Sequence, residues 1–138
     1  MKCPKCGKSI DPAQHGDLTF DDQVWCADCH QYDEELFRHR DFAELENWAV
    51  KICAAFGQEP VPLQQNLKSL TNPRIYWQDS TFVLAEADHQ QRSILLYPPG
   101  FRLPTLCHEL AHIFTGQDHT EAWARTFAKL VAWVKTQL

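Results

Sequence analysis

Two histidines and a glutamate stand at helical spacing in one run near the C-terminus, His108-Glu109-Leu110-Ala111-His112. Residues four apart lie on the same face of an α-helix, so both imidazoles can reach a single metal ion. This spacing suits zinc, and the intervening glutamate then stands beside the water on the metal. Zinc lowers the pKa of that water to about 7, and the glutamate can take its proton. The run therefore predicts a helix with two zinc ligands and a general base, which is the chemistry of a zinc peptidase.

The residues around this run also favour a helix. Pro104 suits a first helical turn, and Gly116 suits a C-terminal stop. One face is apolar and predicts burial, through Leu106, Leu110, Ile113 and Phe114. Two simpler interpretations stay open: an amphipathic helix whose histidines lie on a polar face, and a metal site without catalysis.

A catalytic zinc site needs a third protein ligand and one open position. His119 follows His112 after six residues and lies beyond the helix stop at Gly116. A turn at that stop brings the chain back toward the metal. We therefore predict that His119 is the third ligand, with Glu121 as the main competitor and Asp118 after it.

The segment that follows the third ligand predicts a second helix over residues 120–138. Asp118 or Thr120 suits its N-cap. Its spacing places apolar residues on one face, namely Trp123, Phe127, Leu130, Val131 and Val134. We expect this face to be buried.

The HExxH run, His119 and Trp123 together resemble the zincin metallopeptidases. The pattern is most similar to the small SprT-like group, in which a third histidine follows the HExxH helix and an aromatic residue follows four positions later. The resemblance covers about residues 70–138 and implies a short sheet, the HExxH helix and a helix after it. It also implies peptide-bond hydrolysis, Glu109 as base, and zinc held by His108, His112 and His119. In many SprT-like proteins a zinc-binding segment follows the protease part, whereas here it precedes it.

Two CxxC pairs, Cys3-Pro4-Lys5-Cys6 and Cys26-Ala27-Asp28-Cys29, are separated by 19 residues. Each pair is a knuckle that places two thiolates on one zinc, and four thiolates make a closed, structural site. We predict a zinc ribbon over residues 1–32, so that the chain binds two zinc ions, one structural and one catalytic. Disulfides are the alternative, but the spacing is that of a ribbon. Cys53 and Cys107 are expected to be small buried apolar residues.

The charge of the ribbon bears on its partners. Residues 1–40 carry 8 acidic and 5 basic side chains, and zinc on four thiolates adds further negative charge. A surface that binds nucleic acid is normally basic, so nucleic acid is not favoured, although Lys2, Lys5 and Lys8 form a local basic group. We expect the ribbon to contact a protein partner or to pack on the chain's own catalytic part, which acts on a protein or peptide substrate.

The whole chain has a formal net charge of −5 and 44% hydrophobic residues. This composition suits one modest core with a small appendage that its metal stabilises. No stretch approaches about 18 apolar residues, so we expect no membrane span. No signal peptide precedes Cys3, and the expected location is the reducing cytoplasm.

The segment between the two metal motifs predicts one long helix and then a small sheet. The helix is expected over residues 33–56, with a capping pair of Asp41 and Glu44 if it begins or kinks there. Three strands are expected, at 74–78, 81–87 and 93–97, with a hairpin turn at 88–91. The predicted fold class is therefore α+β. It comprises a small zincin-like domain over 33–138, with a short sheet, the HExxH helix and flanking helices, after the ribbon at 1–32.

By the resemblance, a strand borders the substrate cleft, and a peptide binds there as an added strand. The candidates are 81–87 and 93–97. A group that stabilises the transition state is also expected, and the candidates are Tyr76, Tyr97, His89 and Arg125. The leading hypothesis is a zinc-dependent metallopeptidase. The alternatives are a non-catalytic two-zinc adaptor that binds protein, and a zinc hydrolase of a non-peptide amide.

Overall fold

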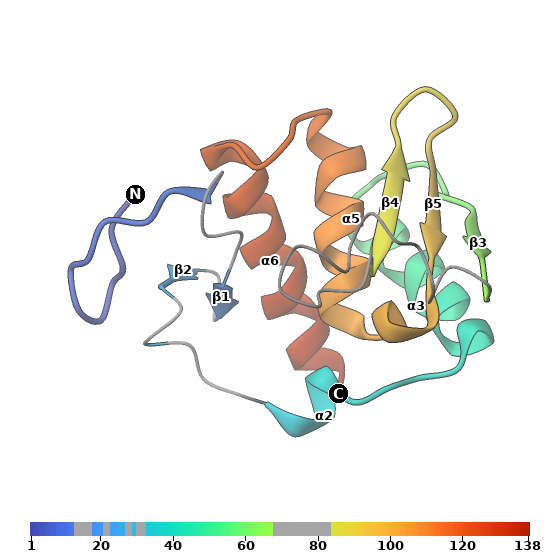
Figure 1. Cartoon of the computed structure of the whole chain (residues 1–138), viewed down its shortest axis with the longest axis horizontal. Coiled ribbons are helices and arrows are strands. Elements are labelled where there is room, and N and C mark those ends of the chain that lie inside the picture. Colours follow the sequence, from blue (N-terminus) through green and yellow to red (C-terminus); the bar gives the residue numbers. More distant parts are fainter. Residues whose placement is uncertain (13–17, 21–22, 27–28, 30–32, 68–83) are drawn as a thin grey trace, which may run out of the picture.

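Helix α5 (Leu103–Thr115) contains the HExxH run and lies between a small sheet and the C-terminal helix α6 (Glu121–Gln137) (Figure 1). The computed structural model describes residues 1–12, 18–20, 23–26, 29, 33–67 and 84–138. Pro104 stands in the first turn of α5, and Gly116 ends the helix in the left-handed conformation, at φ 66°. These helix bounds agree with the sequence prediction.

The apolar faces of α5 and α6 meet in the core. Leu106 and Leu110 of α5 have no exposed surface, and Ile113 is 8% exposed. The predicted stripe of α6 is buried as a whole, at Trp123, Phe127, Leu130, Val131 and Val134. Thr120 is the N-cap of α6, because its hydroxyl accepts a hydrogen bond from the backbone N–H of Trp123.

The sheet has three short strands in the order β3-β5-β4. Their bounds are β3 Leu63–Gln65, β4 Ala85–Asp88 and β5 Ser93–Leu96. β4 and β5 form an antiparallel hairpin, whose turn is fixed by the Asp88 carboxylate accepting from the backbone N–H groups of Gln90 and Gln91 at 3.0 Å. β3 pairs with β5 in parallel, Leu63 opposite Ile94.

The predicted strands have three different outcomes. The strand expected at 93–97 is β5, and the hairpin turn after Asp88 is confirmed. The strand expected at 81–87 falls partly outside the described residues, and its described part corresponds to β4. The strand expected at 74–78 lies outside the described residues. β3 was not predicted.

The single helix expected over 33–56 is wrong. The chain instead forms a short helix α2 (Glu34–Phe37) and a longer helix α3 (Phe42–Ala55). Asp33 caps α2 by accepting from the backbone N–H of Leu36 at 3.0 Å. Asp41 is the N-cap residue of α3, but its side chain makes no capping bond, so the expected capping pair does not form.

The break between α2 and α3 is explained by Arg40, which is 2% exposed. Its guanidinium donates to the carboxylates of Glu44 at 2.8 Å and Glu35 at 3.2 Å. Its backbone N–H donates to the carbonyl oxygen of Phe101 at 2.8 Å. A buried guanidinium is tolerated only with such partners, so the chain leaves the helix to make these bonds.

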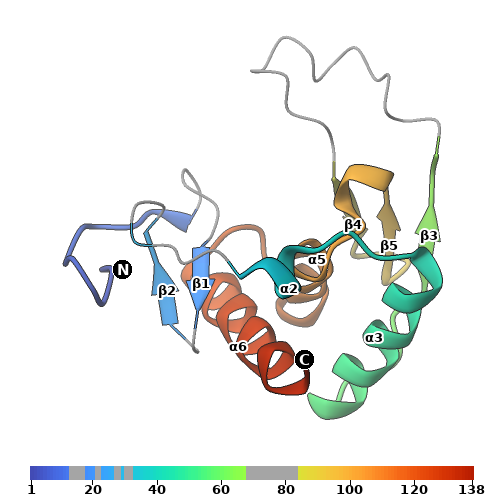
Figure 2. The same cartoon turned by 90° about the horizontal axis from the view of Figure 1, so that it is seen from below.

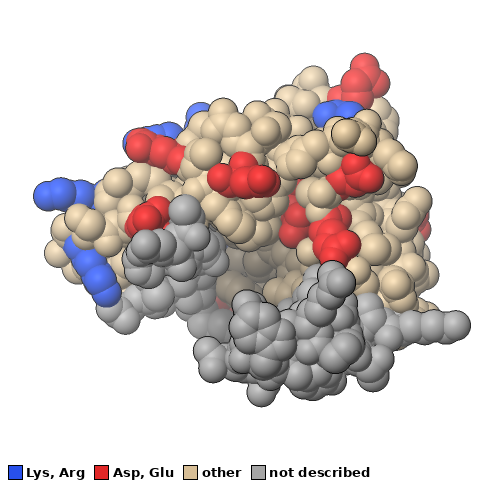
Figure 3. All heavy atoms as spheres, turned by 45° about the horizontal axis from the view of Figure 1, so that its top comes forward, with Lys and Arg blue, Asp and Glu red and all other residues tan. Residues whose placement is uncertain are grey.

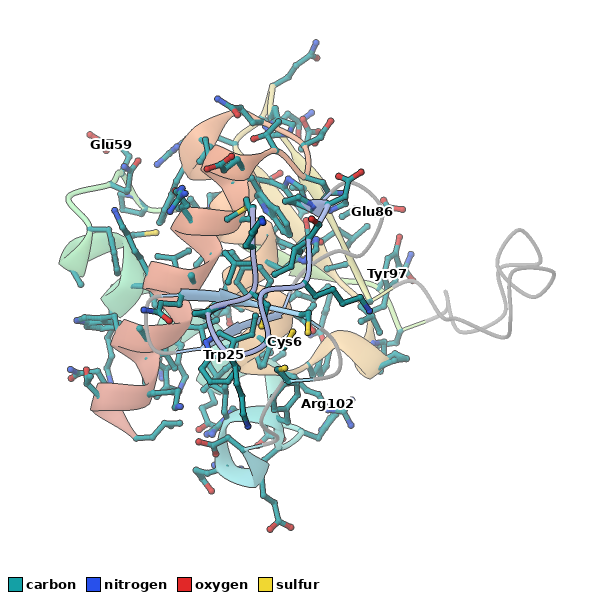
Figure 4. All side chains as sticks on the ribbon, turned by 90° about the vertical axis from the view of Figure 1, so that its left-hand side faces the viewer. Cys6, Trp25, Glu59, Glu86, Tyr97 and Arg102 are labelled. Atoms are coloured by element: carbon teal, nitrogen blue, oxygen red, sulfur yellow. The ribbon has the colours of Figure 1, made fainter. Side chains whose placement is uncertain are left out.

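A second arginine joins the same region to the start of α5. Arg102 donates from Nε to the carbonyl oxygen of Phe37 at 2.9 Å and from a terminal nitrogen to that of Pro99 at 3.2 Å (Figure 4 labels this residue). The short turn η2 (Pro98–Gly100) lies between β5 and α5. These bonds hold the N-terminal end of α5 against α2.

The N-terminal segment lies on the far side of α6 from α5 (Figure 2). Its strands β1 (Leu18–Phe20) and β2 (Gln23–Trp25) pair antiparallel and contact α6. Its buried residues Cys3, Ile10, Val24 and Cys26 belong to the same hydrophobic cluster as the core of α5 and α6. The cysteine-bearing segment therefore packs on the rest of the chain.

The described structure is a small α+β fold, as the sequence predicts. The boundary between residues 32 and 33 stays a prediction. Among the described residues, none of the helices has the length and apolar character needed to cross a bilayer.

Candidate metal centres

The imidazole nitrogens of His108, His112 and His119 lie within 4.8 Å of one another. Nε2 of His108 is 3.2 Å from Nε2 of His112 and 3.2 Å from Nε2 of His119. Two imidazole nitrogens on one tetrahedral zinc lie about 3.3 Å apart, because each Zn–N bond is about 2.0–2.1 Å. The donor set and its spacing therefore fit a zinc ion with three protein ligands.

A hydrogen bond to Gln117 fixes which ring nitrogen of His112 carries the proton. Nδ1 of His112 lies 2.8 Å from the backbone carbonyl oxygen of Gln117, and a carbonyl can only accept, so Nδ1 carries the hydrogen. In the neutral ring Nε2 then has a free lone pair, which faces His108. A hydrogen bond of this kind is the usual way in which a protein orients a histidine ligand.

Burial favours the neutral form of the two helical histidines, His108 and His112. Burial lowers the pKa of His108 to about 3, and the neighbouring rings of His112 and His119 act in the same direction. Burial also lowers the pKa of His112. Neutral imidazole is the form that binds zinc.

His119 reaches the cluster from the loop between α5 and α6. Its backbone has φ 40°, in the left-handed region that a residue with a β-carbon rarely adopts. The hydroxyl of Thr120 donates to the side-chain oxygen of Gln117, which closes this loop. The loop thus returns the chain to the metal position after the stop at Gly116.

The two other candidates for the third ligand, Glu121 and Asp118, have other partners. Glu121 is paired with Arg125, whose guanidinium donates to it at 2.6 Å. The Asp118 carboxylate lies 3.6 Å from Nδ1 of His112, on the side of the ring away from Nε2. Neither carboxylate belongs to the group of nitrogens that converge.

Glu109 lies next to the cluster on α5 and is 8% exposed. Burial raises the pKa of its carboxyl to about 7, and the negative charges of Glu86 and Asp118 act in the same direction. A cation at the histidines acts in the opposite direction, because it favours the carboxylate. Figure 3 shows acidic side chains scattered over the face that carries the α5–α6 loop and the tip of the β4–β5 hairpin.

The four candidates for a group that stabilises the transition state have different positions relative to the histidine cluster. His89, in the hairpin turn, has its ring centre 6.3 Å from that of His112, and its Nε2 lies 3.6 Å from the carboxylate of Asp118. Tyr97 is 7% exposed, and burial and Glu86 raise the pKa of its hydroxyl (Figure 4). Arg125 pairs with Glu121, and Tyr76 lies outside the described residues. Among the candidates that the structure describes, His89 has its ring near a histidine of the cluster.

The four cysteines of the two CxxC pairs also converge. Their sulfurs lie within 4.8 Å of one another, and Sγ of Cys6 is 3.6 Å from Sγ of Cys26. Two sulfurs on a tetrahedral zinc lie about 3.8 Å apart, because each Zn–S bond is about 2.3 Å. Figure 4, which views the N-terminal segment from the front, labels Cys6 and Trp25 of this segment. Gly7 follows the second cysteine with φ 75°, the left-handed turn that glycine allows.

The hydrogen bonds of this cluster favour deprotonated sulfur at one position. Burial raises the pKa of Cys3, but the backbone N–H groups of Cys26, Cys6 and Lys5 outweigh it and bring the pKa to about 6. Burial and the other three sulfurs raise the pKa of Cys29 to about 12. Four thiolates at this spacing would repel one another. A bound zinc ion would offset this repulsion, because it binds sulfur in the thiolate form.

Cys53 and Cys107 stand apart from both clusters. Cys53 is 1% exposed and Cys107 has no exposed surface, and burial raises the pKa of each thiol. Both are buried core residues, as expected.

The chain matches no protein-family model, and comparisons with curated proteins and with solved structures find no match either. The two candidate metal sites are therefore interpreted from their own geometry.

Proposed function

We propose that this chain is a zinc-dependent hydrolase of peptide bonds, with its catalytic zinc on His108, His112 and His119 and a structural zinc on the four ribbon cysteines. The observation that supports it best is the convergence of three Nε2 atoms beside a buried glutamate on the same helix. We further propose that residues 33–138 form the catalytic part and residues 1–32 the ribbon.

Zinc at this position supplies a Lewis acid and lowers the pKa of water to about 7. Glu109 takes the proton of the attacking water and passes it to the leaving amine. The hydrogen bond from His112 to Gln117 holds the ring in the orientation that keeps Nε2 toward the site. His89 donates to the oxygen on which negative charge develops.

The substrate is an extended peptide that lies along β4. This strand contacts α5, and among the described residues its edge away from β5 has no strand partner. Backbone hydrogen bonds to such an edge give affinity, and neighbouring side chains give specificity. Of the two segments that the resemblance offers, the one that contains β4 is therefore the proposed cleft strand.

Glu109→Gln tests the reaction. The zinc-loaded full chain is incubated with an unfolded protein, and cleavage is followed by mass spectrometry. Glu109→Gln should keep both zinc ions and lose about 100-fold or more of the rate. Glu46→Gln, on the exposed side of α3, is the control and should match the wild type.

Two outcomes would contradict the proposal. Cleavage by Glu109→Gln at the wild-type rate would rule out this base. A wild type that holds two zinc ions and cleaves no peptide would favour the protein-binding adaptor, or a hydrolase of a non-peptide amide if a small amide is cleaved instead.

A further inference from the structure

Trp123 of α6 lies against all three histidines. Its ring centre is 4.8 Å from that of His108, 5.1 Å from that of His112 and 4.6 Å from that of His119. The indole stacks on His112, at 19° between the planes, and meets the other two rings edge to face, at 71°. The indole of Trp123 thus packs against the rings of all three candidate ligands.

The polar atom of the indole also acts on the first ligand. Nε1–H of Trp123 donates to the backbone carbonyl oxygen of His108 at 3.2 Å. This bond ties α6 to α5 at the turn that carries the ligand. Trp123 has no exposed surface, so the bond is sheltered from competing water.

Trp123 contacts the region of His119 through both its ring and its backbone. His119 stands in a loop with φ 40°, and its backbone therefore gains nothing from a helix or strand. The backbone N–H of Trp123 bonds to the hydroxyl of Thr120, the residue after His119, at 3.3 Å. Both the ring and the backbone of Trp123 thus bear on the position of His119.

We propose that Trp123 is a positioning residue, which holds the three imidazole nitrogens together before the metal binds. This inference rests on the metal site of the proposed function, and it concerns affinity and geometry rather than the hydrolytic step. Other groups restrain single rings, since Gln117 binds Nδ1 of His112 and Phe127 packs edge to face on His108 at 5.5 Å. The indole, by contrast, contacts all three rings at once, so its loss should let the nitrogens separate. Loss of the indole therefore weakens metal binding more than it weakens the fold.

The test measures cobalt binding to the histidine cluster of the full chain, with the cysteine cluster already loaded with zinc. Trp123→Leu should bind Co²⁺ about 10- to 100-fold more weakly, as is usual when a residue that supports metal ligands is lost. It should also lose intensity in the absorption of tetrahedral cobalt. Trp123→Phe keeps a ring but loses the Nε1 donor, and about a fivefold loss is expected from one hydrogen bond.

Leu130→Ala is the matched control, because Leu130 is also fully buried on α6 and lies seven residues, about two helical turns, beyond Trp123. It should unfold at lower denaturant yet bind Co²⁺ within about twofold of the wild type. If Trp123→Leu fails to fold, Trp123→Phe still decides the matter.

Wild-type affinity and an unchanged cobalt spectrum in Trp123→Phe and in folded Trp123→Leu would overturn the positioning role. An equal loss in Leu130→Ala would also overturn it, because the effect would then come from general destabilisation. Failure of the proposed function shows itself elsewhere, as a wild type that binds cobalt with the expected tryptophan dependence but hydrolyses no peptide.

Discussion

His112 donates a 2.8 Å hydrogen bond from Nδ1 to the backbone carbonyl oxygen of Gln117, five residues later. The last turn of α5 and the loop that follows it are therefore joined through a candidate metal ligand. The loop that brings His119 to the cluster also sets the orientation of His112. Changes to the loop backbone should consequently be felt at the metal even where they touch no ligand.

Gly116→Ala tests this link. Gly116 has φ 66°, where a β-carbon is strained, and the strain should cost about 1 kcal/mol of stability. Relief of the strain moves the Gln117 carbonyl, so metal affinity at the histidines should fall as well. Isothermal titration and chemical denaturation measure the two effects.

Gly57→Ala is the control for that variant. Gly57 follows the C-cap of α3 with φ 65°, and a β-carbon there would meet open space, as at Gly116. It should lose similar stability and keep the metal affinity. Equal affinities in the two variants would show that the loop does not orient His112.

The six cysteines should separate into two classes on alkylation. With zinc bound, all should react slowly, since the thiolates of the ribbon are ligands and Cys53 and Cys107 are buried with raised pKa values. A chelator should release four for rapid reaction and leave two protected until denaturant is added. Intact mass gives the count, and rapid loss of Cys107 in the native chain would contradict its burial.

Cys26→Ser should reduce the zinc content from two ions per chain to one. Because the cysteine segment shares the core of α6, we also expect the whole chain to unfold at a lower temperature in a single transition. Metal analysis and calorimetry are the measurements. Separate unfolding of residues 1–32 with an unchanged main transition would instead support an independent ribbon.

Gly100→Ala should destabilise the fold strongly. A β-carbon at Gly100 would lie 2.0 Å from the backbone oxygen of Leu84, which accepts from the N–H of Tyr97 at 3.1 Å. The start of β4 must then move from the turn before α5, at a cost of about 2–3 kcal/mol. Urea denaturation measures this loss against Gly57→Ala, and a loss no larger than that control would contradict the close approach.

The helices around the candidate site were predictable because their signals are local. The proline and glycine that bound α5, and the apolar spacing of α6, act within a few residues of the positions that they define. The two cysteine pairs and the HExxH run are likewise short patterns whose chemistry follows from residue type. Thr120 rather than Asp118 as the N-cap needed the structure, since both residues suit that role.

The elements that were predicted wrongly or not at all depend on partners far away in the sequence. The expected helix over 33–56 is interrupted because Arg40 bonds to Phe101, about 60 residues later. β3 was not predicted, because Gln64 and Gln65 are exposed and polar and give no strand pattern. The segment becomes a strand by pairing with β5.

The sequence by itself determined the four sulfur donors of the cysteine site and the two helical histidine donors of the other site, because their chemistry and spacing are local. Only the tertiary structure decided how the site is completed. It turned the loop so that His119 rather than Glu121 meets the helix, placed Trp123 behind the three rings, and laid β4 beside α5. Each of these depends on packing between segments, and packing energy is set by contacts that local patterns do not contain.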